Sequence, residues 1–274
     1  MKTILIAVAW PYANAPIHEG HPPGYLIPAD IFARYNRLIG NEVLMVSGTD
    51  AHGTPNTIAA EKAGIPTGEY VDSVHNINLE FWKKLGISYD LYTKTSNEAH
   101  KEKFKELFME IYNNEFVIKK KVKYFYSEKE RKALLDRYIE GECPHCHFEK
   151  ARGDQCDNCG KTLTPFELIN PYSIYGDTKL EVKETEDLFF DLPKLQNELE
   201  KWTSDKTYWK SHVINFTKAW LDEGLLPRAV TRDIDWGIEI PDKIDLPDKD
   251  NKRFYVWVEA VAGYLTASKI WSEI

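Results

Sequence analysis

The chain has 274 residues, of which 43% are hydrophobic and 28% are charged, and this is the composition of an ordinary globular protein with one domain and a substantial insert. The net charge of −8 excludes a general basic coat for nucleic acid, so any contact with RNA must be local, and we expect no DNA partner. The apolar run at residues 4–7 is too short for a membrane span, and no small-residue cleavage site follows it. We therefore expect a cytoplasmic protein without a membrane partner.

The first part of the chain alternates between strands and helices. Apolar residues predict buried strands at residues 3–9 and 42–47, and each is followed by a loop and then a helix. The first helix is predicted to run to about Ile39 and to end at Gly40. Its apolar face has 3.6-residue spacing and comprises Ile27, Ile31, Tyr35 and Leu38. This alternation predicts a parallel sheet with crossover connections.

The character of the chain changes at about Phe116. Helices are predicted at residues 58–62, 70–85 and 98–113, and strand and turn follow at 117–126. Four of the residues from Lys119 to Lys123 are lysines, which fits either a local RNA contact or a solvated edge strand.

The parallel sheet is predicted to resume as a strand at residues 253–258, with a helix from about Ala260. We therefore predict an α/β fold, a Rossmann-like nucleotide-binding domain with a parallel sheet, interrupted by a zinc-bearing connective insert. Residues 1–115 would form the first half of the catalytic domain, 116–225 the insert, and 226–274 a truncated second half.

The cysteines of the chain form one cluster with the spacing C-x2-C-x9-C-x2-C. They are Cys143, Cys146, Cys156 and Cys159. Each x2 spacing lets one tight turn present two thiolates to the same ion, and four thiolates suit a tetrahedral Zn²⁺. A shell of four sulfurs leaves no open position for water, so we predict one structural zinc per chain rather than a catalytic one. Free thiols or disulfides are the alternative, and His145 and His147 are expected to be spectators.

Two loops are expected at the carboxyl ends of the strands, where ligands bind in a parallel sheet. The first loop places His18, Gly20 and His21 at the N-terminus of a helix, where free backbone N–H groups favour the binding of phosphate. The two histidines could donate hydrogen bonds to a transferring phosphoryl group, and Gly20 would let a nucleotide approach the backbone. By spacing alone, two such histidines are more often surface or N-cap residues than ligands.

Residues 11–21 (PYANAPIHEGH) resemble the ATP-binding signature of the class I aminoacyl-tRNA synthetases. Together with residues 48–55 (GTDAHGTP), they resemble the methionyl-tRNA synthetase family in particular. Residues 227–237, 255–260 and 263–264 agree with that family, as does a knuckled zinc insert between the two halves of the fold. The resemblance covers the whole chain, with separated motifs in the right order.

The resemblance implies an ATP-dependent methionine–tRNA ligase. Such an enzyme joins methionine to ATP, brought with Mg²⁺, as methionyl-adenylate, and then transfers it to tRNA(Met). Little covalent chemistry falls to the protein, which positions the reactants and stabilises charge.

The resemblance also implies a role for each motif residue. His18, Gly20 and His21 would bind ATP, and His18 and His21 would act in catalysis together with Asp50 and Arg232. Asp50 would pair with the α-ammonium of methionine, although an N-cap for the next helix is its alternative. The methionine pocket would be completed by a further set of residues, namely Tyr12, His52, Trp257 and Tyr264.

The chain departs from the family pattern at several positions. Glu19 replaces an aliphatic residue of the signature, Pro22 and Pro23 remove backbone donors from the first helical turn, and Val261 and Ala262 replace a Pro-Ile pair. The family's Lys-Met-Ser-Lys-Ser loop and anticodon-binding domain do not occur in these residues, so we expect an N-terminal fragment that is poorly active alone. The alternatives are a synthetase for leucine or isoleucine and a non-catalytic module that binds the tRNA acceptor end or a protein partner.

Overall fold

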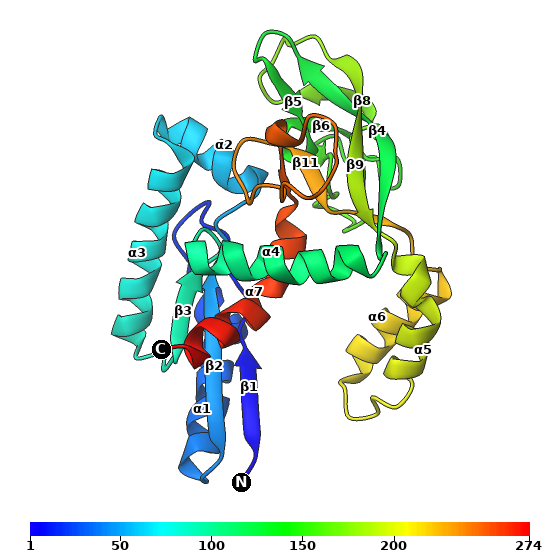
Figure 1. The fold of residues 1–274 in the computed structure, drawn as a ribbon. Coiled ribbons are helices and arrows are strands. Elements are labelled where there is room, and N and C mark those ends of the chain that lie inside the picture. The colour runs from blue at the N-terminus through cyan, green and yellow to red at the C-terminus, as the bar shows by residue number, and fades with distance from the viewer.

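The computed structural model describes all residues from Met1 to Ile274 and contains a parallel sheet at the N-terminal end. Its strands are β1 (Thr3–Ala7), β2 (Glu42–Thr49) and β3 (Leu91–Lys94), in the order β1-β2-β3. The helices α1 (Ile27–Leu38), α2 (Thr54–Ala63) and α3 (Thr67–Leu85) lie in the connections between these strands (Figure 1). The predicted α/β fold with a parallel sheet is confirmed.

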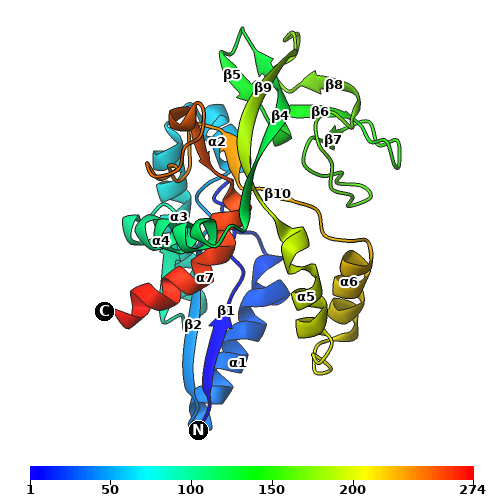
Figure 2. The same ribbon diagram turned by 45° about the vertical axis from the view of Figure 1, so that its right-hand side comes forward.

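A second sheet begins where the chain leaves this body through α4 (Glu98–Asn113), a helix predicted with the same bounds. Its strand order is β10-β9-β4-β5, and β4 and β9 pair antiparallel over most of their length. Figure 2 shows this long ribbon rising away from the parallel sheet, with a smaller sheet of β6, β7 and β8 beside it. The strands of the two sheets are β4 (Val117–Ser127), β5 (Lys132–Leu134), β6 (Ile139–Glu142), β7 (Ala151–Arg152), β8 (Ile169–Ser173), β9 (Glu181–Phe190) and β10 (Arg228–Ala229).

The chain returns to the parallel-sheet body through a helical hairpin and a short two-stranded sheet. The hairpin consists of α5 (Gln196–Thr203) and α6 (Ser211–Asp222), and it stands apart from the body in Figure 1. The strands β11 (Thr231–Asp233) and β12 (Lys252–Phe254) then pair antiparallel and lead into α7 (Val256–Ser272).

The lysines of β4 face acidic residues across the strand pair. Lys121 stands opposite Glu186 and Lys123 opposite Glu184, and only β9 pairs with this part of β4. Opposite charges on neighbouring strands compensate one another. The stretch is therefore a solvated, charge-balanced ribbon rather than a free basic patch.

The predicted parallel strand at residues 253–258 is wrong. Only Lys252–Phe254 is a strand, it is antiparallel, and α7 already begins at Val256. Valines and aromatics give this run a high strand propensity, but Val256, Glu259 and Ala262 recur at helical spacing on the buried face of α7. Packing of that face has overridden the local preference.

The apolar face predicted for the first helix also lies differently from expectation. Ile31, Tyr35 and Leu38 are exposed, whereas Asp30, Ala33 and Asn36 are buried. The polar side is buried because Asp30 accepts hydrogen bonds from the backbone N–H and the hydroxyl of Ser88, and a buried carboxylate needs such partners.

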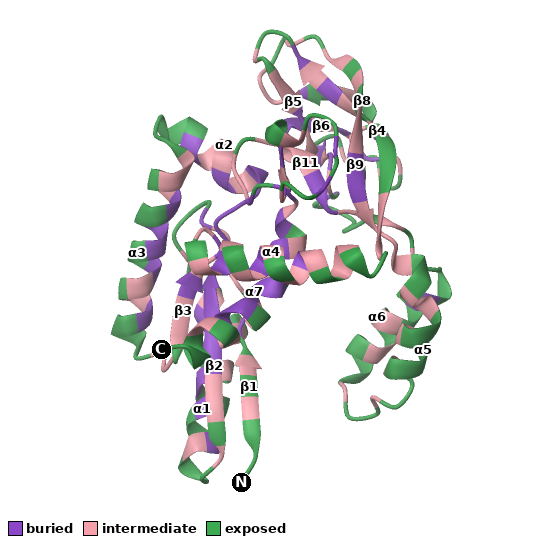
Figure 3. Ribbon diagram, viewed as in Figure 1, coloured by how far each residue is buried: buried purple, intermediate pink, exposed green.

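The largest core cluster joins the parallel-sheet body to the returning chain. Phe254 of β12 packs edge-on against Phe104 and Phe108 of α4, with ring centroids 4.8 and 4.5 Å apart. Leu188 of β9 and Ile238 belong to the same cluster. Because Phe254 is held in this core, it fixes the position of the chain just before α7 begins. Figure 3 shows buried residues concentrated along α7, the strands and this junction.

We expect Phe254→Ala to lower the free energy of unfolding by about 3–5 kcal/mol, because it leaves a cavity in the middle of this cluster. Phe216→Ala on α6, whose residue is 71% exposed, serves as the control and should change it by less than about 0.5 kcal/mol. Urea denaturation followed by tryptophan fluorescence measures both, and equal effects would contradict the assigned core.

Candidate active site

The carboxyl ends of β1 and β2 are tied together by backbone hydrogen bonds. The N–H of Asp50 donates to the carbonyl of Pro11 at 2.8 Å, and the N–H of Ala13 donates to the carbonyl of Asp50 at 3.3 Å. Tyr12 and Asp50 thus form an isolated parallel bridge beyond the strands. The two loops singled out in the sequence are therefore adjacent.

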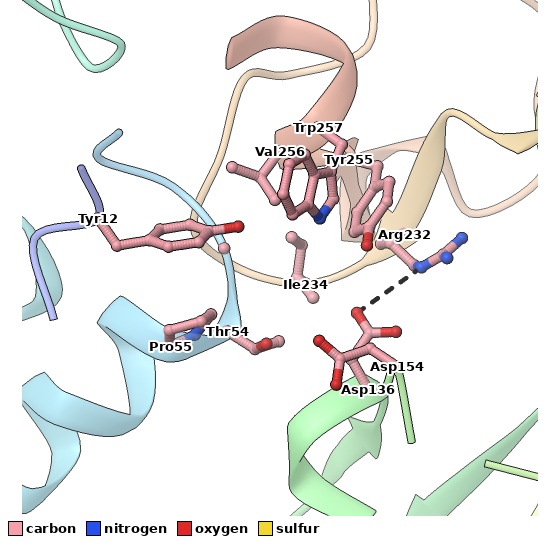
Figure 4. Close-up of a pocket in the computed structure, with 11 residues that line it drawn as sticks. Tyr12, Thr54, Pro55, Asp136, Asp154, Arg232, Ile234, Tyr255, Val256 and Trp257 are labelled. Atoms are coloured by element: carbon pink, nitrogen blue, oxygen red, sulfur yellow. Dashed lines mark ion pairs between the residues drawn. The ribbon is translucent and has the colours of Figure 1, made fainter. Parts of the chain in front are cut away.

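A cavity opens beside this bridge, and its walls come from distant parts of the chain (Figure 4). Tyr12 stands on one side, and Trp257 at the start of α7 meets it edge-on, with ring centroids 6.5 Å apart. Gly53 lies against Tyr12 and Val256 with a φ of 95°, and a Cβ at this position would come within 3.4 Å of both side chains. The remaining lining residues are Thr54, Pro55, Asp136, Asp154, Arg232, Ile234 and Tyr255.

Arg232 projects into this cavity from β11. Its guanidinium lies 4.5 Å from the ring centroid of Tyr255 and 3.9 Å from the carboxylate of Asp136. The ion pair of Arg232 is thus with Asp136 and not with Asp50. Burial raises the pKa of Asp136, although the charge of Arg232 opposes that shift.

Asp50 is buried, and one of its carboxylate oxygens has no hydrogen-bond partner. Burial, followed by repulsion from Glu259, raises the pKa of Asp50 well above its usual range. Asp50 does not cap α2, since Gly53 occupies the N-cap position. A buried carboxylate with one oxygen left without a protein partner is suited to receiving a cation from a ligand.

Behind Asp50 lies a buried polar network that the sequence did not reveal. Glu259 of α7 is fully buried and contacts His52 Nδ1 at 2.8 Å and His100 Nε2 at 3.0 Å. His100 Nδ1 contacts the hydroxyl of Thr266 at 2.7 Å. Burial alone would raise the pKa of Glu259, but the two histidines outweigh it and lower that pKa.

His52 therefore belongs to this buried network and not to the lining of the cavity. Tyr264, also expected in the pocket, is half-buried and meets Trp10 edge-on at 6.1 Å. The indole N–H of Trp10 is buried without a hydrogen-bond partner. Trp10 was not singled out in the sequence, and Glu259 was given no role although it lies in the motif at residues 255–260, because the partners of both come from distant segments.

The histidines of the first loop form a separate cluster, in which His18 is exposed and His21 is half-buried. The ring centroids of His18 and His21 are 4.2 Å apart, and the N–H of Gly20 donates to His18 Nδ1 at 3.1 Å. A Cβ at Gly20 would lie 2.9 Å from the His18 ring, so a side chain there would require that ring to move. The turn that follows, Pro22–Leu26, is π-helical and continuous with α1, and such turns are frequent at functional sites. Glu19 is exposed and leaves this arrangement undisturbed.

The four cysteines converge on one point, as the spacing predicted. Their sulfur atoms all lie within 4.8 Å of one another, with Cys143–Cys159 at 3.9 Å and Cys146–Cys156 at 3.6 Å. A tetrahedral ion with metal–sulfur bonds of about 2.3 Å places sulfurs about 3.8 Å apart. The cluster is thus of the right size to hold a metal ion, and no disulfide links these cysteines.

The two turns that carry the cysteine pairs, residues 143–147 and 156–160, have the same backbone hydrogen-bonding pattern. The N–H of His147 donates to the carbonyl of Cys143 at 3.0 Å, and the N–H of Gly160 donates to the carbonyl of Cys156 at 2.9 Å. Both donors have left-handed backbones, with φ of 58° and 72°. The ring of His147 contacts Glu142 at 2.6 Å, so it lies outside the sulfur cluster.

The comparisons with known proteins agree with the motifs. The family model described as tRNA synthetases class I (M) matches residues 4–274. A methionine–tRNA ligase of Dehalococcoides mccartyi is 49% identical over 271 residues, and one of Thermoplasma volcanium is 46% identical over 271 residues; each alignment covers 99% of this chain. The chain spans about half the length of these curated relatives, 48% and 49%.

Solved structures support the fold. Mycobacterium tuberculosis methionyl-tRNA synthetase, in complex with methionyl-adenylate, superposes with a TM-score of 0.73 at 23% identity. The match covers 97% of this chain and 47% of that one. Among the helices of the structure, none combines the length and apolarity needed to cross a membrane.

We expect Asp50→Asn to stabilise the unliganded protein at pH 8 by on the order of 1–3 kcal/mol, since it removes a buried charge without a partner. The folded-state pKa of Asp50 is raised, so the cost of its charge is greatest at high pH and fades as pH falls toward the unfolded value. The gain should therefore be smaller at pH 5 than at pH 8 in urea titrations. Asp72→Asn on the surface of α3 is the control, and a gain independent of pH would refute the assignment.

Proposed function

The chain belongs to the family of class I tRNA synthetases (M), and on that premise we propose that the protein activates methionine with ATP and transfers it to tRNA(Met). The observation that carries this proposal is the buried carboxylate of Asp50, one oxygen of which has no hydrogen-bond partner, next to a cavity with aromatic walls. Such a site suits an amino acid, whose ammonium supplies the missing charge.

Methionine would bind with its ammonium on Asp50 and its side chain among Tyr12, Trp257 and Tyr264. Sulfur–aromatic contacts favour a thioether modestly over an alkyl chain. His52, held by Glu259, would support the floor of this site from behind. Arg232 would approach the methionine carboxylate from the opposite wall, because it already enters the cavity from β11.

ATP would bind at the cluster of His18, Gly20 and His21. The methionine carboxylate then attacks the α-phosphate, and pyrophosphate leaves with the electron pair of the broken bond. The two histidines would donate hydrogen bonds to the phosphoryl oxygens, where negative charge accumulates in the transition state. Mg²⁺ would enter with ATP, and methionyl-adenylate would pass its methionyl group to the terminal adenosine of the tRNA.

The cysteine cluster would hold one structural Zn²⁺. Four thiolates are the donor set that zinc takes in closed tetrahedral sites, and the sulfur spacing is close to that geometry. We assign residues 1–115 and 226–274 to the two halves of the catalytic domain, residues 116–225 to the insert, and the cytoplasm as the compartment.

In the full-length protein, methionine-dependent exchange of pyrophosphate into ATP tests this function. Asp50→Ala should lower kcat/KM for methionine by about 10²–10³-fold, since it removes a charge-assisted pair from a desolvated site. Asp72→Ala on α3 is the matched control and should leave exchange unchanged. Absence of exchange in the full-length wild type would instead indicate a non-catalytic module that binds the tRNA acceptor end or a protein partner.

Metal analysis of the purified protein tests the zinc assignment. The wild type should contain one zinc per chain, and Cys156→Ser should contain well below one and unfold at a lower temperature, because metal binding stabilises the insert. His145→Ala is the control and should retain zinc, since the four sulfurs already close the shell. Zinc retained by Cys156→Ser or lost from His145→Ala would contradict the four-sulfur site.

A further inference from the structure

The side chain of Lys252 on β12 is fully buried, which is rare for a lysine and costly unless the ammonium is well paired. Its Nζ lies 2.9 Å from both carboxylate oxygens of Asp233 and 3.1 Å from Oδ1 of Asp187. It also donates to the hydroxyl of Thr185 at 2.8 Å. One ammonium therefore holds strand β11, through Asp233, and strand β9 of the predicted insert, through Thr185 and Asp187.

Thr231, the residue before Arg232 in β11, belongs to the same polar cluster. Its hydroxyl donates to Asp187 at 2.7 Å and accepts from the N–H of Leu188 at 3.0 Å. Side chains alternate across a strand, so Thr231 and Asp233 face β9 while Arg232 between them faces the cavity. Both neighbours of Arg232 are thus attached to β9.

The guanidinium of Arg232 stacks on the ring of Tyr255 but has few polar contacts of its own. Its ion pair with Asp136 is long, at 3.9 Å, and its one protein hydrogen bond goes to the adjacent carbonyl of Thr231. The place of the guanidinium in the cavity is consequently set by the backbone of β11 and by the ring of Tyr255, which directly follows β12. A shift of β11 on β9 would carry Arg232 with it, and small misplacements at a reacting centre are costly.

We propose that Lys252 is a positioning residue that attaches β11 to β9 and thereby holds Arg232 at the methionine carboxylate. The inference rests on the proposed function, which assigns Arg232 to the substrate. Lys252 itself does not touch the cavity. A stabilising role alone would not distinguish methionine from ATP, whereas positioning of Arg232 affects methionine first.

The experiment measures methionine-dependent ATP–pyrophosphate exchange in the full-length protein, normalised to active sites by the amount of adenylate formed in a single turnover. Lys252→Met should raise KM for methionine by about tenfold or more and leave KM for ATP within about twofold. Lys249→Met is the matched control. Lys249 lies three residues before Lys252 and forms a surface ion pair with Asp242, so its replacement should change neither KM value. Because Lys252→Met removes the ammonium from the buried Asp187 and the half-buried Asp233, Thr231→Val serves as a second, milder variant that should act in the same direction.

A double-mutant cycle with Arg232→Gln decides whether Lys252 acts through the arginine. Lys252→Met should add little to KM for methionine once Arg232 is replaced, because the two substitutions disturb the same contact. Additive effects, equal effects on methionine and ATP, or loss of active sites without a change in KM would overturn the proposal. Arg232→Gln without effect on KM for methionine would overturn it as well, while intact exchange would leave the synthetase assignment standing.

Discussion

The cleft depends on the contact of Glu259 with His52 and His100, which joins segments 207 and 159 residues apart in the chain. It fixes α7 against the loop after β2 and against α4, and so sets the place of Trp257 opposite Tyr12. The same charge adds to the cost of ionising Asp50 nearby. One oxygen of this buried carboxylate is therefore left without a hydrogen-bond partner in the protein, at a position where a negative charge is costly.

Strand β9 is attached to the returning chain by two different kinds of contact. The aromatic cluster around Phe254 supplies apolar burial, and the ammonium of Lys252 supplies directional pairing. Apolar packing tolerates sliding more readily than a buried ion cluster does, since the latter loses its partners with small displacements. The junction thus combines stability with a defined register between β9 and β11.

Much of the fold could be predicted from local patterns. The helix at 98–113, the first strands and the cysteine cluster depend on periodicity and spacing, which a single segment carries in full. The strand at 253–258 was predicted wrongly, because valine and tryptophan indicate a strand wherever packing does not decide. The exposure of the apolar face of α1 was not predicted, because it depends on a contact between distant segments. Asp30 on the opposite face is buried against Ser88, which lies 58 residues further along the chain.

The candidate site was predictable where motifs are contiguous and unpredictable where they are not. Tyr12, Asp50, Arg232 and Trp257 each sit in a recognisable stretch, and three of them line one cavity in the structure. Asp136, which pairs with Arg232, comes from the predicted insert and has no motif of its own. Contacts of this kind arise from tertiary pairing, which a sequence read without relatives does not encode locally.

The alternation of lysines and glutamates along β4 and β9 has a consequence for any polyanion that approaches the insert. Where lysines of β4 face acidic residues of β9, as Lys121 and Lys123 do, the opposite charges cancel much of the long-range field, so this part of the ribbon exerts little electrostatic steering on a phosphate backbone. Encounter with RNA on this side would be governed by shape and by aromatic stacking, and its rate would vary little with ionic strength.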